Sequence, residues 1–225
     1  MLTITAINGN TISFDTPLIY EHYGAGAPIT NKYGVLDTRA GVGLLSRNIK
    51  ITKGPDVNGW GCRVLAYSYS DFDPDNPAAG VLPLTGSIIF DGVEVDSCGQ
   101  YDTAYAGVRF DKLGNFENNS NKPNLITRSS FHNSNGMAMW VANTTNIKID
   151  NNVFHFARKF LLYAEYVNNY TVTNNLLIGA RARSELLPIL STTVMVDDVS
   201  CYEQYTSINY DTDNVTVTNN LAQGS

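Results

Sequence analysis

Polar residues at equivalent points of a repeating pattern are the first candidates for chemistry in this sequence. Aligned by the starts of the repeats, Asp96, Asn133 and His155 occur nine residues along on three successive repeats. Polysaccharide cleavage on one lateral face of a coil requires an acid, a base and a cation together. The catalytic candidates are therefore Asp96, Arg109, His132 and His155. The favoured interpretation is still a solvated polar column with one hydrogen-bonded histidine, because such columns are ordinary on repeat proteins.

An acidic segment offers a candidate metal site. Asp71, Asp73 and Asp75 form D-x-D-x-D, which is how a calcium loop begins. The sixth position is Asn76 instead of Gly and the twelfth is Leu82 instead of Glu, so this is not an EF-hand. A weak extracellular Ca²⁺ site remains an alternative to a solvated acidic loop, and the solvated loop is favoured. We expect no other cofactor, since no dinucleotide, P-loop or HExxH pattern is present.

Tyrosines near acidic residues are a second kind of candidate site. Exposed tyrosine beside Asp or Asn can stack on a sugar ring and bond its hydroxyl groups. Packing in the core is an equal alternative for these side chains. The candidate ligand-binding residues are Tyr67, Tyr69, Tyr101, Asp102 and Tyr105.

Cysteines and glycosylation sequons bear on the compartment. Cys62, Cys98 and Cys201 form no CxxC pair, so they indicate no zinc site, and their pairing stays open. Four Asn-x-Ser/Thr sequons favour a secreted or surface protein. The candidate glycosylation sites are Asn118, Asn143, Asn169 and Asn214.

Composition excludes several classes of protein. The net charge is −6 and Lys and Arg form no cluster, so a nucleic-acid surface is not expected. No run of eighteen apolar residues exists, so membrane insertion by this segment is not expected. The sequence holds 25 Asn and 18 Gly but only 6 Glu and 7 Lys, which favours turns over exposed helix faces. The composition therefore predicts an all-β chain.

The sequence repeats itself at intervals of 21 to 24 residues. In each repeat, apolar residues alternate with polar ones and are followed by Asn or a similar residue, which is typical of a strand with one buried face. Two longer intervals contain insertions at 71–80 and 111–123, rich in Pro, Gly, Asn and Asp. The pattern predicts a right-handed parallel β-helix of about seven turns with two inserted loops. The turn starts are near 48, 87, 124, 146, 169, 193 and 214.

Paired asparagines close several of these repeats. Stacked about 4.8 Å apart, their amides can bond one another along the coil axis. We expect one column to include Asp198 and the next to include Ser130. The expected ladder consists of Asn151, Asn152, Asn174, Asn175, Asn219 and Asn220.

The first third of the chain differs from the repeats. Residues 1–47 are expected to form a β-rich cap of the coil, with a hairpin around Asn8 and Gly9, and residues 48–225 the repeats, in one continuous domain. Arg47 is expected to cap the coil by bonding backbone carbonyls.

Three segments carry a resemblance to a known family. They are Thr16-Pro-Leu-Ile-Tyr-Glu-His22, Thr38-Arg-Ala-Gly-Val-Gly-Leu-Leu-Ser-Arg-Asn-Ile-Lys-Ile51 and Gly92-Val-Glu-Val-Asp-Ser-Cys-Gly-Gln100. The chain resembles the parallel β-helix region that follows the G8 domain in fibrocystin, fibrocystin-L and the related cell-surface and secreted hyaluronan-degrading proteins. This resemblance implies one coil portion of a large extracellular or cell-surface protein. Gly41 stands where the family pattern has an acidic residue, which argues against transfer of the cleavage activity.

These observations favour a non-catalytic structural or interaction module that binds a glycan or an extracellular protein partner. A polysaccharide-cleaving hydrolase or lyase is the alternative. A filament subunit that stacks through its coil ends is a second alternative, because open strand edges favour self-association. Neighbouring domains of a larger chain are the remaining expected partners.

Overall fold

The computed structural model describes residues 1–20, 22, 24, 29–32, 34–36, 40–55, 59–72, 81–101, 103, 105–113, 123–180, 194–197 and 213–223. Every regular element within these ranges is a β-strand, so the predicted all-β class is confirmed there. No helix in this described part is long and apolar enough to cross a membrane.

The chain divides into two compact units, residues 1–42 and 43–225. The first contains two antiparallel hairpins, one made by β1 (Ile4–Asn8) and β2 (Thr11–Phe14), the other by β3 (Ile29–Asn31) and β4 (Gly34–Leu36). The predicted hairpin around Asn8 and Gly9 is thus present. The division falls a few residues before the expected boundary at 47.

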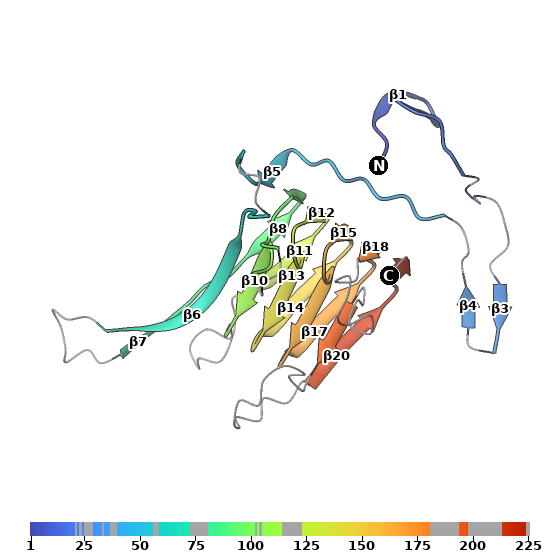
Figure 1. Ribbon diagram of the computed structural model, residues 1–225. Coiled ribbons are helices and arrows are strands. Elements are labelled where there is room, and N and C mark those ends of the chain that lie inside the picture. The colour runs from blue at the N-terminus through green and yellow to red at the C-terminus, as the bar shows by residue number, and fades with distance from the viewer. Residues whose placement is uncertain are drawn as a thin grey trace. The chain divides into compact units, whose positions relative to one another are not determined.

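The second unit is built from three stacked sheets of mainly parallel strands (Figure 1). Sheet A consists of β8 (Ile89–Asp91), β11 (Asn124–Thr127), β14 (Thr145–Asp150), β17 (Asn168–Thr173) and β20 (Asp213–Thr218). Sheet B consists of β5 (Ile49–Thr52), β9 (Val93–Asp96), β12 (Ser130–Ser134), β15 (Val153–Ala157), β18 (Leu176–Ala180) and β21 (Leu221–Gln223). Sheet C consists of β7 (Val81–Thr85), β6 (Val64–Phe72), β10 (Val108–Asp111), β13 (Met139–Ala142), β16 (Leu162–Glu165) and β19 (Val194–Asp197).

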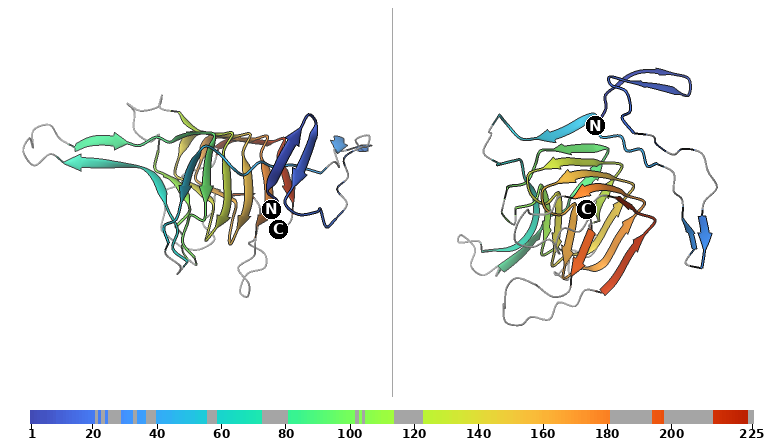
Figure 2. Two further views of the ribbon diagram at one scale, coloured as in Figure 1. Left: turned by 90° about the horizontal axis from the view of Figure 1, so that it is seen from above. Right: turned by 45° about the vertical axis from the view of Figure 1, so that its right-hand side comes forward.

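The chain visits sheets A, B and C in turn, and from β8 onward each strand pairs in parallel with the strand three places later. Figure 2 shows the resulting stack from two sides. This topology agrees with the expected parallel β-helix. Side chains at matching points of successive strands therefore form columns along the stack.

The interior of the stack is apolar. Phe131 lies over Phe154 with ring centroids 4.7 Å apart, and Phe154 pairs with Leu177 on the next strand. Ile149 and Val172 form a matching column from sheet A and are fully buried. Each such side chain contributes about 2 kcal/mol through removal from water. The alternation of apolar and polar residues in the sequence is what aims these side chains inward.

Asparagines close the turns between sheets A and B. Asn152 Oδ1 accepts from the backbone amide of Ser129, and Asn175 Oδ1 accepts from the amide of Asn152 at 2.9 Å. Asn220 continues the series one strand further on. The residues just before them, Asn151, Asn174 and Asn219, all have φ between 55° and 57°. Asparagine tolerates this left-handed backbone better than most residues, so the paired Asn signal reflects a turn that recurs on each coil.

The predicted alignment was wrong by one residue for the repeat placed at 124, whereas the repeats placed at 87 and 146 are in the predicted register. Asn124 pairs with Ile147, not with Asn146, and the interior apolar residue of that strand is Ile126. The ladder therefore reaches Ser129 instead of Ser130. The cause is a coil of 23 residues where the sequence alignment placed 22, and a slip of one residue moves every side chain to the opposite face.

Two predicted turn starts do not belong to the column of the others. The segment at 48 forms β5, which pairs with β9 in sheet B, and the segment at 193 precedes β19 in sheet C. β17 pairs directly with β20, so the 45 residues from 169 to 214 contain one coil with a long insertion. Asp198, which was expected in the asparagine ladder, lies outside the described residues.

The first predicted inserted loop is flanked by an antiparallel strand pair, β6 and β7, and residues 73–80 lie outside the described residues. β6 continues to Phe72 and pairs with antiparallel β7, which extends away from the stack in Figure 2.

Arg47 lies just before β5, the first strand of sheet B. Its guanidinium group donates to the backbone oxygens of Leu44, Ser46 and Arg128, so it bonds backbone carbonyls as expected.

Candidate functional site

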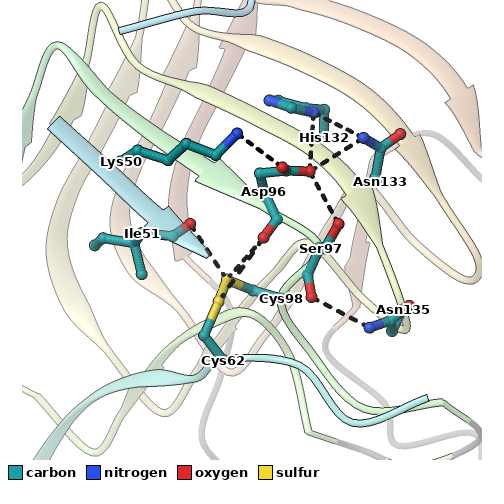
Figure 3. The surroundings of a disulfide bond; sticks show 9 residues. All are labelled: Lys50, Ile51, Cys62, Asp96, Ser97, Cys98, His132, Asn133 and Asn135. Atoms are coloured by element: carbon teal, nitrogen blue, oxygen red, sulfur yellow. Dashed lines mark hydrogen bonds and ion pairs between the residues drawn. A yellow bond between two sulfur atoms is a disulfide. The ribbon is translucent and has the colours of Figure 1, made fainter. Parts of the chain in front are cut away.

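A polar cluster lies on the outward side of sheet B where β5, β9 and β12 run side by side. Strand register sets Lys50 beside Glu94, and His132 beside Asp96. Figure 3 shows Lys50, Asp96 and His132 converging from these three strands. We call Lys50, Glu94, Asp96 and His132 the Lys50 cluster.

The Lys50 ammonium group bridges two carboxylates. Its Nζ lies 2.8 Å from Glu94 Oε1 and 2.9 Å from Asp96 Oδ2. His132 also contacts both acids, with Nε2 3.0 Å from Glu94 Oε1 and Nδ1 3.3 Å from Asp96 Oδ1. The backbone amide of Arg47 donates to the remaining oxygen of Glu94, and Asn133 Nδ2 donates to Asp96 Oδ1. Both carboxylates are therefore fully engaged.

These contacts set the protonation of the cluster. Burial alone would raise the pKa of Glu94, but hydrogen bonds from Lys50, the Arg47 amide and His132 outweigh it and hold that pKa below its usual value. Asp96 follows the same balance, because bonds from Lys50, Asn133 and Ser97 overcome its desolvation and lower its pKa. The bonds to Glu94 and Asp96 in turn raise the pKa of Lys50. Glu94, Asp96 and Lys50 are thus each held in the charged form at neutral pH.

The same residues have the composition of a metal site. One ligand atom each from Glu94, Asp96 and His132 lies within 4.8 Å of the others. Carboxylates and imidazole together suit a divalent transition metal. Lys50 supplies the positive charge between the two carboxylates, so a metal would have to displace it.

A disulfide bond borders the cluster. Cys62 and Cys98 are bonded, with Cα atoms 4.4 Å apart, which closes the pairing question that the sequence left open. Cys98 Sγ lies 3.7 Å from the backbone oxygen of Ile51 and 3.6 Å from that of Asp96 (Figure 3). The bond ties the segment before β6 to the end of β9.

The predicted catalytic residues are only partly brought together. Asp96, His132 and His155 form one column of sheet B, and it is His132, not Asn133, that occupies the middle position. Burial lowers the pKa of His155, and its Nδ1 finds no hydrogen-bond partner among the described residues. Sequence reasoning missed Glu94 and Lys50, although each is a charged residue between two apolar residues of its strand. The strand of Lys50 was aligned with the wrong sheet, whereas the strand of Glu94 was aligned correctly but its partner Lys50 was placed elsewhere.

Arg109 does not join this column, because β10 belongs to sheet C. There it forms an ion pair with Asp111, Nη2 to Oδ2 at 2.7 Å, and lies over the ring of Trp140, with Cζ 4.0 Å from the centroid. The prediction that Arg109 acts together with His132 is therefore wrong.

The aromatic candidates occupy two places. Tyr67 lies on β6 and is partly exposed, while Tyr101 and Tyr105 lie in the turn between β9 and β10 and are 56% and 45% exposed. Tyr69 is a residue of β6 in the β6–β7 hairpin, and Asp102 is outside the described residues. Trp60, 58% exposed and bridged through its backbone to Gln100, was not among the predicted residues.

The acidic segment and the sequons are only partly described. Asp71 lies within strand β6, and Asp73 and Asp75 lie outside the described residues. The Ca²⁺ site therefore stays a prediction. Asn118 is likewise outside. Asn169 and Asn214 are exposed, and their side chains bond along a surface column that begins at Asn146. Asn143 is half-buried.

The fold and site define an all-β protein with parallel strands in stacked sheets. No family model matches the chain, and no solved structure matches it. The chain is similar to Fibrocystin-L from Homo sapiens, with 30% identity over 150 residues that cover 62% of this chain. It spans about 3% of the length of that protein. The similarity supports a fibrocystin-like relationship for the matched part.

Proposed function

We propose that this chain is a non-catalytic extracellular module of a fibrocystin-like protein. In this proposal the chain is a right-handed parallel β-helix that binds an acidic glycan through one row of its turns. The disulfide between Cys62 and Cys98 favours an oxidising compartment, where such bonds persist. The similarity to Fibrocystin-L supports the same assignment.

The observation that carries the proposal is a row of exposed aromatic and basic side chains between sheets B and C. Tyr101 and Tyr105 are joined there by Trp60. Arg63 lies over the ring of Tyr105 at 4.4 Å, and Arg158, two coils further along, lies over Tyr101 at 5.1 Å. We call these five residues the turn row.

The turn row has the composition of a binding surface. Trp, Tyr and Arg contribute most to binding energy in known interfaces, and contiguous patches of exposed apolar side chains mark interaction sites. The two guanidinium groups add positive charge to a chain whose net charge is −6. A carboxylated or sulfated sugar chain can stack on the rings and pair with the guanidinium groups.

Calorimetry with hyaluronan and heparin oligosaccharides tests this function. We expect binding that weakens as salt rises, and at least a tenfold loss of affinity in the double variants Y101A/Y105A and R63A/R158A. Tyr20→Ala is the matched control, because Tyr20 is 76% exposed but lies in the first unit. Equal affinity in all variants, or no binding of either glycan, would overturn the assignment.

The Lys50 cluster favours a second candidate, polysaccharide cleavage, because it brings together an acid, a base and a cation on one lateral face. Its closed set of ion pairs argues against this, since a catalytic acid must be able to exchange its proton. Incubation of the chain with hyaluronan at millimolar calcium, and with chelator, followed by size analysis, separates the two functions. Fragmentation that is lost in H132A would establish cleavage, and intact polymer would exclude it for this substrate.

A further inference from the structure

A second polar cluster, on sheet C, is independent of both the Lys50 cluster and the turn row. Register sets Arg109, Trp140 and Tyr163 in one column across β10, β13 and β16. The neighbouring column contains Asp111, Ala142 and Glu165. We call Arg109, Asp111, Trp140, Tyr163 and Glu165 the Arg109 cluster.

Two aromatic donors hold the carboxylate of this cluster. Trp140 Nε1 donates to Glu165 Oε1, and the Tyr163 hydroxyl donates to Glu165 Oε2, both at 3.1 Å. The Trp140 and Tyr163 rings meet edge to face with centroids 5.8 Å apart, and Tyr163 stacks on Phe160 at 5.2 Å. The rings are packed against buried residues on one side and partly exposed on the other. Their orientation is therefore fixed before any ligand arrives.

The cluster retains hydrogen-bonding capacity. Arg109 Nε is buried and has no hydrogen-bond partner among the described residues, although the guanidinium group is paired with Asp111 through Nη2. Burial raises the pKa of Glu165 against the bonds from Tyr163 and Trp140, so this carboxyl group exchanges a proton closer to neutrality than an exposed one.

We propose that the Arg109 cluster binds an uncharged saccharide on the outward face of sheet C. Partly exposed aromatic rings suit the apolar face of a pyranose, and a carboxyl group beside a guanidinium group suits neighbouring hydroxyls. Asp111 already offsets the charge of Arg109, and Glu165 adds a further acidic group, so an anionic sugar is disfavoured. The ligand class thus differs from the acidic glycan assigned to the turn row, and this inference goes beyond that function.

Tryptophan fluorescence gives a direct test, because the chain has only two tryptophans. In the variant W60F the emission comes from Trp140 alone. Maltohexaose, cellohexaose and xylohexaose are the uncharged probes, and a hyaluronan hexasaccharide is the charged one. We expect at least one uncharged probe to shift the Trp140 emission and to bind by calorimetry at millimolar concentration or tighter, while the hyaluronan hexasaccharide leaves that emission unchanged.

Conservative variants locate the binding on the cluster. Glu165→Gln and Arg109→Lys are each expected to weaken binding at least tenfold in the W60F background, with thermal unfolding used to show that they remain folded. The variant Y101A/Y105A is expected to leave this binding unchanged, so failure of the turn row and failure of the Arg109 cluster are distinguishable. No response to any uncharged probe, or a response that persists in both Glu165→Gln and Arg109→Lys, would overturn the inference.

Discussion

The Lys50 cluster and the Arg109 cluster occupy equivalent outward positions on two sheets of one stack, yet their electrostatics are opposite. In the Lys50 cluster an ammonium group lies between two carboxylates, whose pKa values it helps to lower. In the Arg109 cluster the guanidinium group pairs with Asp111, and burial raises the pKa of Glu165. Hydrogen bonds from a cation lower the pKa of a carboxyl group, and burial without a contacting cation raises it.

This difference indicates which of the two clusters stabilises the fold and which is suited to bind a ligand. The carboxylates of the Lys50 cluster are satisfied by hydrogen bonds, so they join β5, which among the described strands pairs with β9 alone, to the rest of sheet B. The Arg109 cluster lies on β10, β13 and β16, strands already paired on both sides, and its polar groups are not required for strand pairing. The first cluster is therefore expected to contribute more to folding, and the second more to binding.

The largest effect is expected from removing the disulfide beside the Lys50 cluster. The double variant C62A/C98A is expected to lose about 4 kcal/mol of unfolding free energy, because the bond closes a 36-residue separation. Urea denaturation of oxidised wild type and the variant measures the loss. A loss below about 1 kcal/mol would show that strand pairing alone holds this side of sheet B.

A smaller effect is expected from Lys50→Met. This change leaves two mostly buried carboxylates without their ammonium partner, and we expect a loss of about 2 kcal/mol at pH 7, reduced from the value for a fully buried pair because Lys50 is 45% exposed. Lys148→Met is the matched control, since Lys148 forms an exposed pair with Asp150 at 3.4 Å and is expected to cost under about 0.5 kcal/mol. Equal losses in the two variants would contradict the comparison.

The pH dependence of the Lys50 cluster has a definite sign. Glu94 and Asp96 have lowered pKa values in the folded state, so their contribution is present above their unfolded values of about 4.3 and 3.9 and is lost as pH falls through the folded values. The difference between wild type and Lys50→Met is therefore expected to shrink in acid. Urea denaturation at a series of pH values from 7 down to 3 checks this.

The smallest effect is expected from Glu165→Gln, and its sign is reversed. The folded-state pKa of Glu165 is raised, so its contribution to stability is fully present below about pH 4.3 and is lost as pH rises through the folded value. Replacement by glutamine is expected to leave stability at pH 7 unchanged or raised by about 0.5 kcal/mol. A loss above about 2 kcal/mol at pH 7 would show that Glu165 is a charged, structural partner like Glu94.

Particular residues show how far the sequence alone could go. The repeated Asn-Asn pairs and the alternating apolar residues predicted parallel strands in coils, because left-handed turns and inward-facing side chains leave a local signal. The column of Asp96 and His155 was placed correctly, but Asn133 was chosen where His132 lies, since one coil is a residue longer than its alignment suggested. Lys50 was missed because β5 was aligned with sheet A instead of sheet B, and Glu94, on a correctly aligned strand, then lacked its partner.

The sequence by itself determined the all-β class, the coil period and the turns at which asparagine adopts a positive φ, because each of these depends on neighbouring residues. Only the tertiary structure decided that Cys62 bonds Cys98, that Lys50 reaches Glu94 and Asp96, and that Arg109 lies apart from His132 beside Trp140. These contacts join residues that are between 31 and 46 positions apart in the sequence and lie on stacked coils. Arg109 and His132 do not meet because their strands belong to different sheets. Strand register between coils sets them all, and register depends on the exact length of every intervening turn.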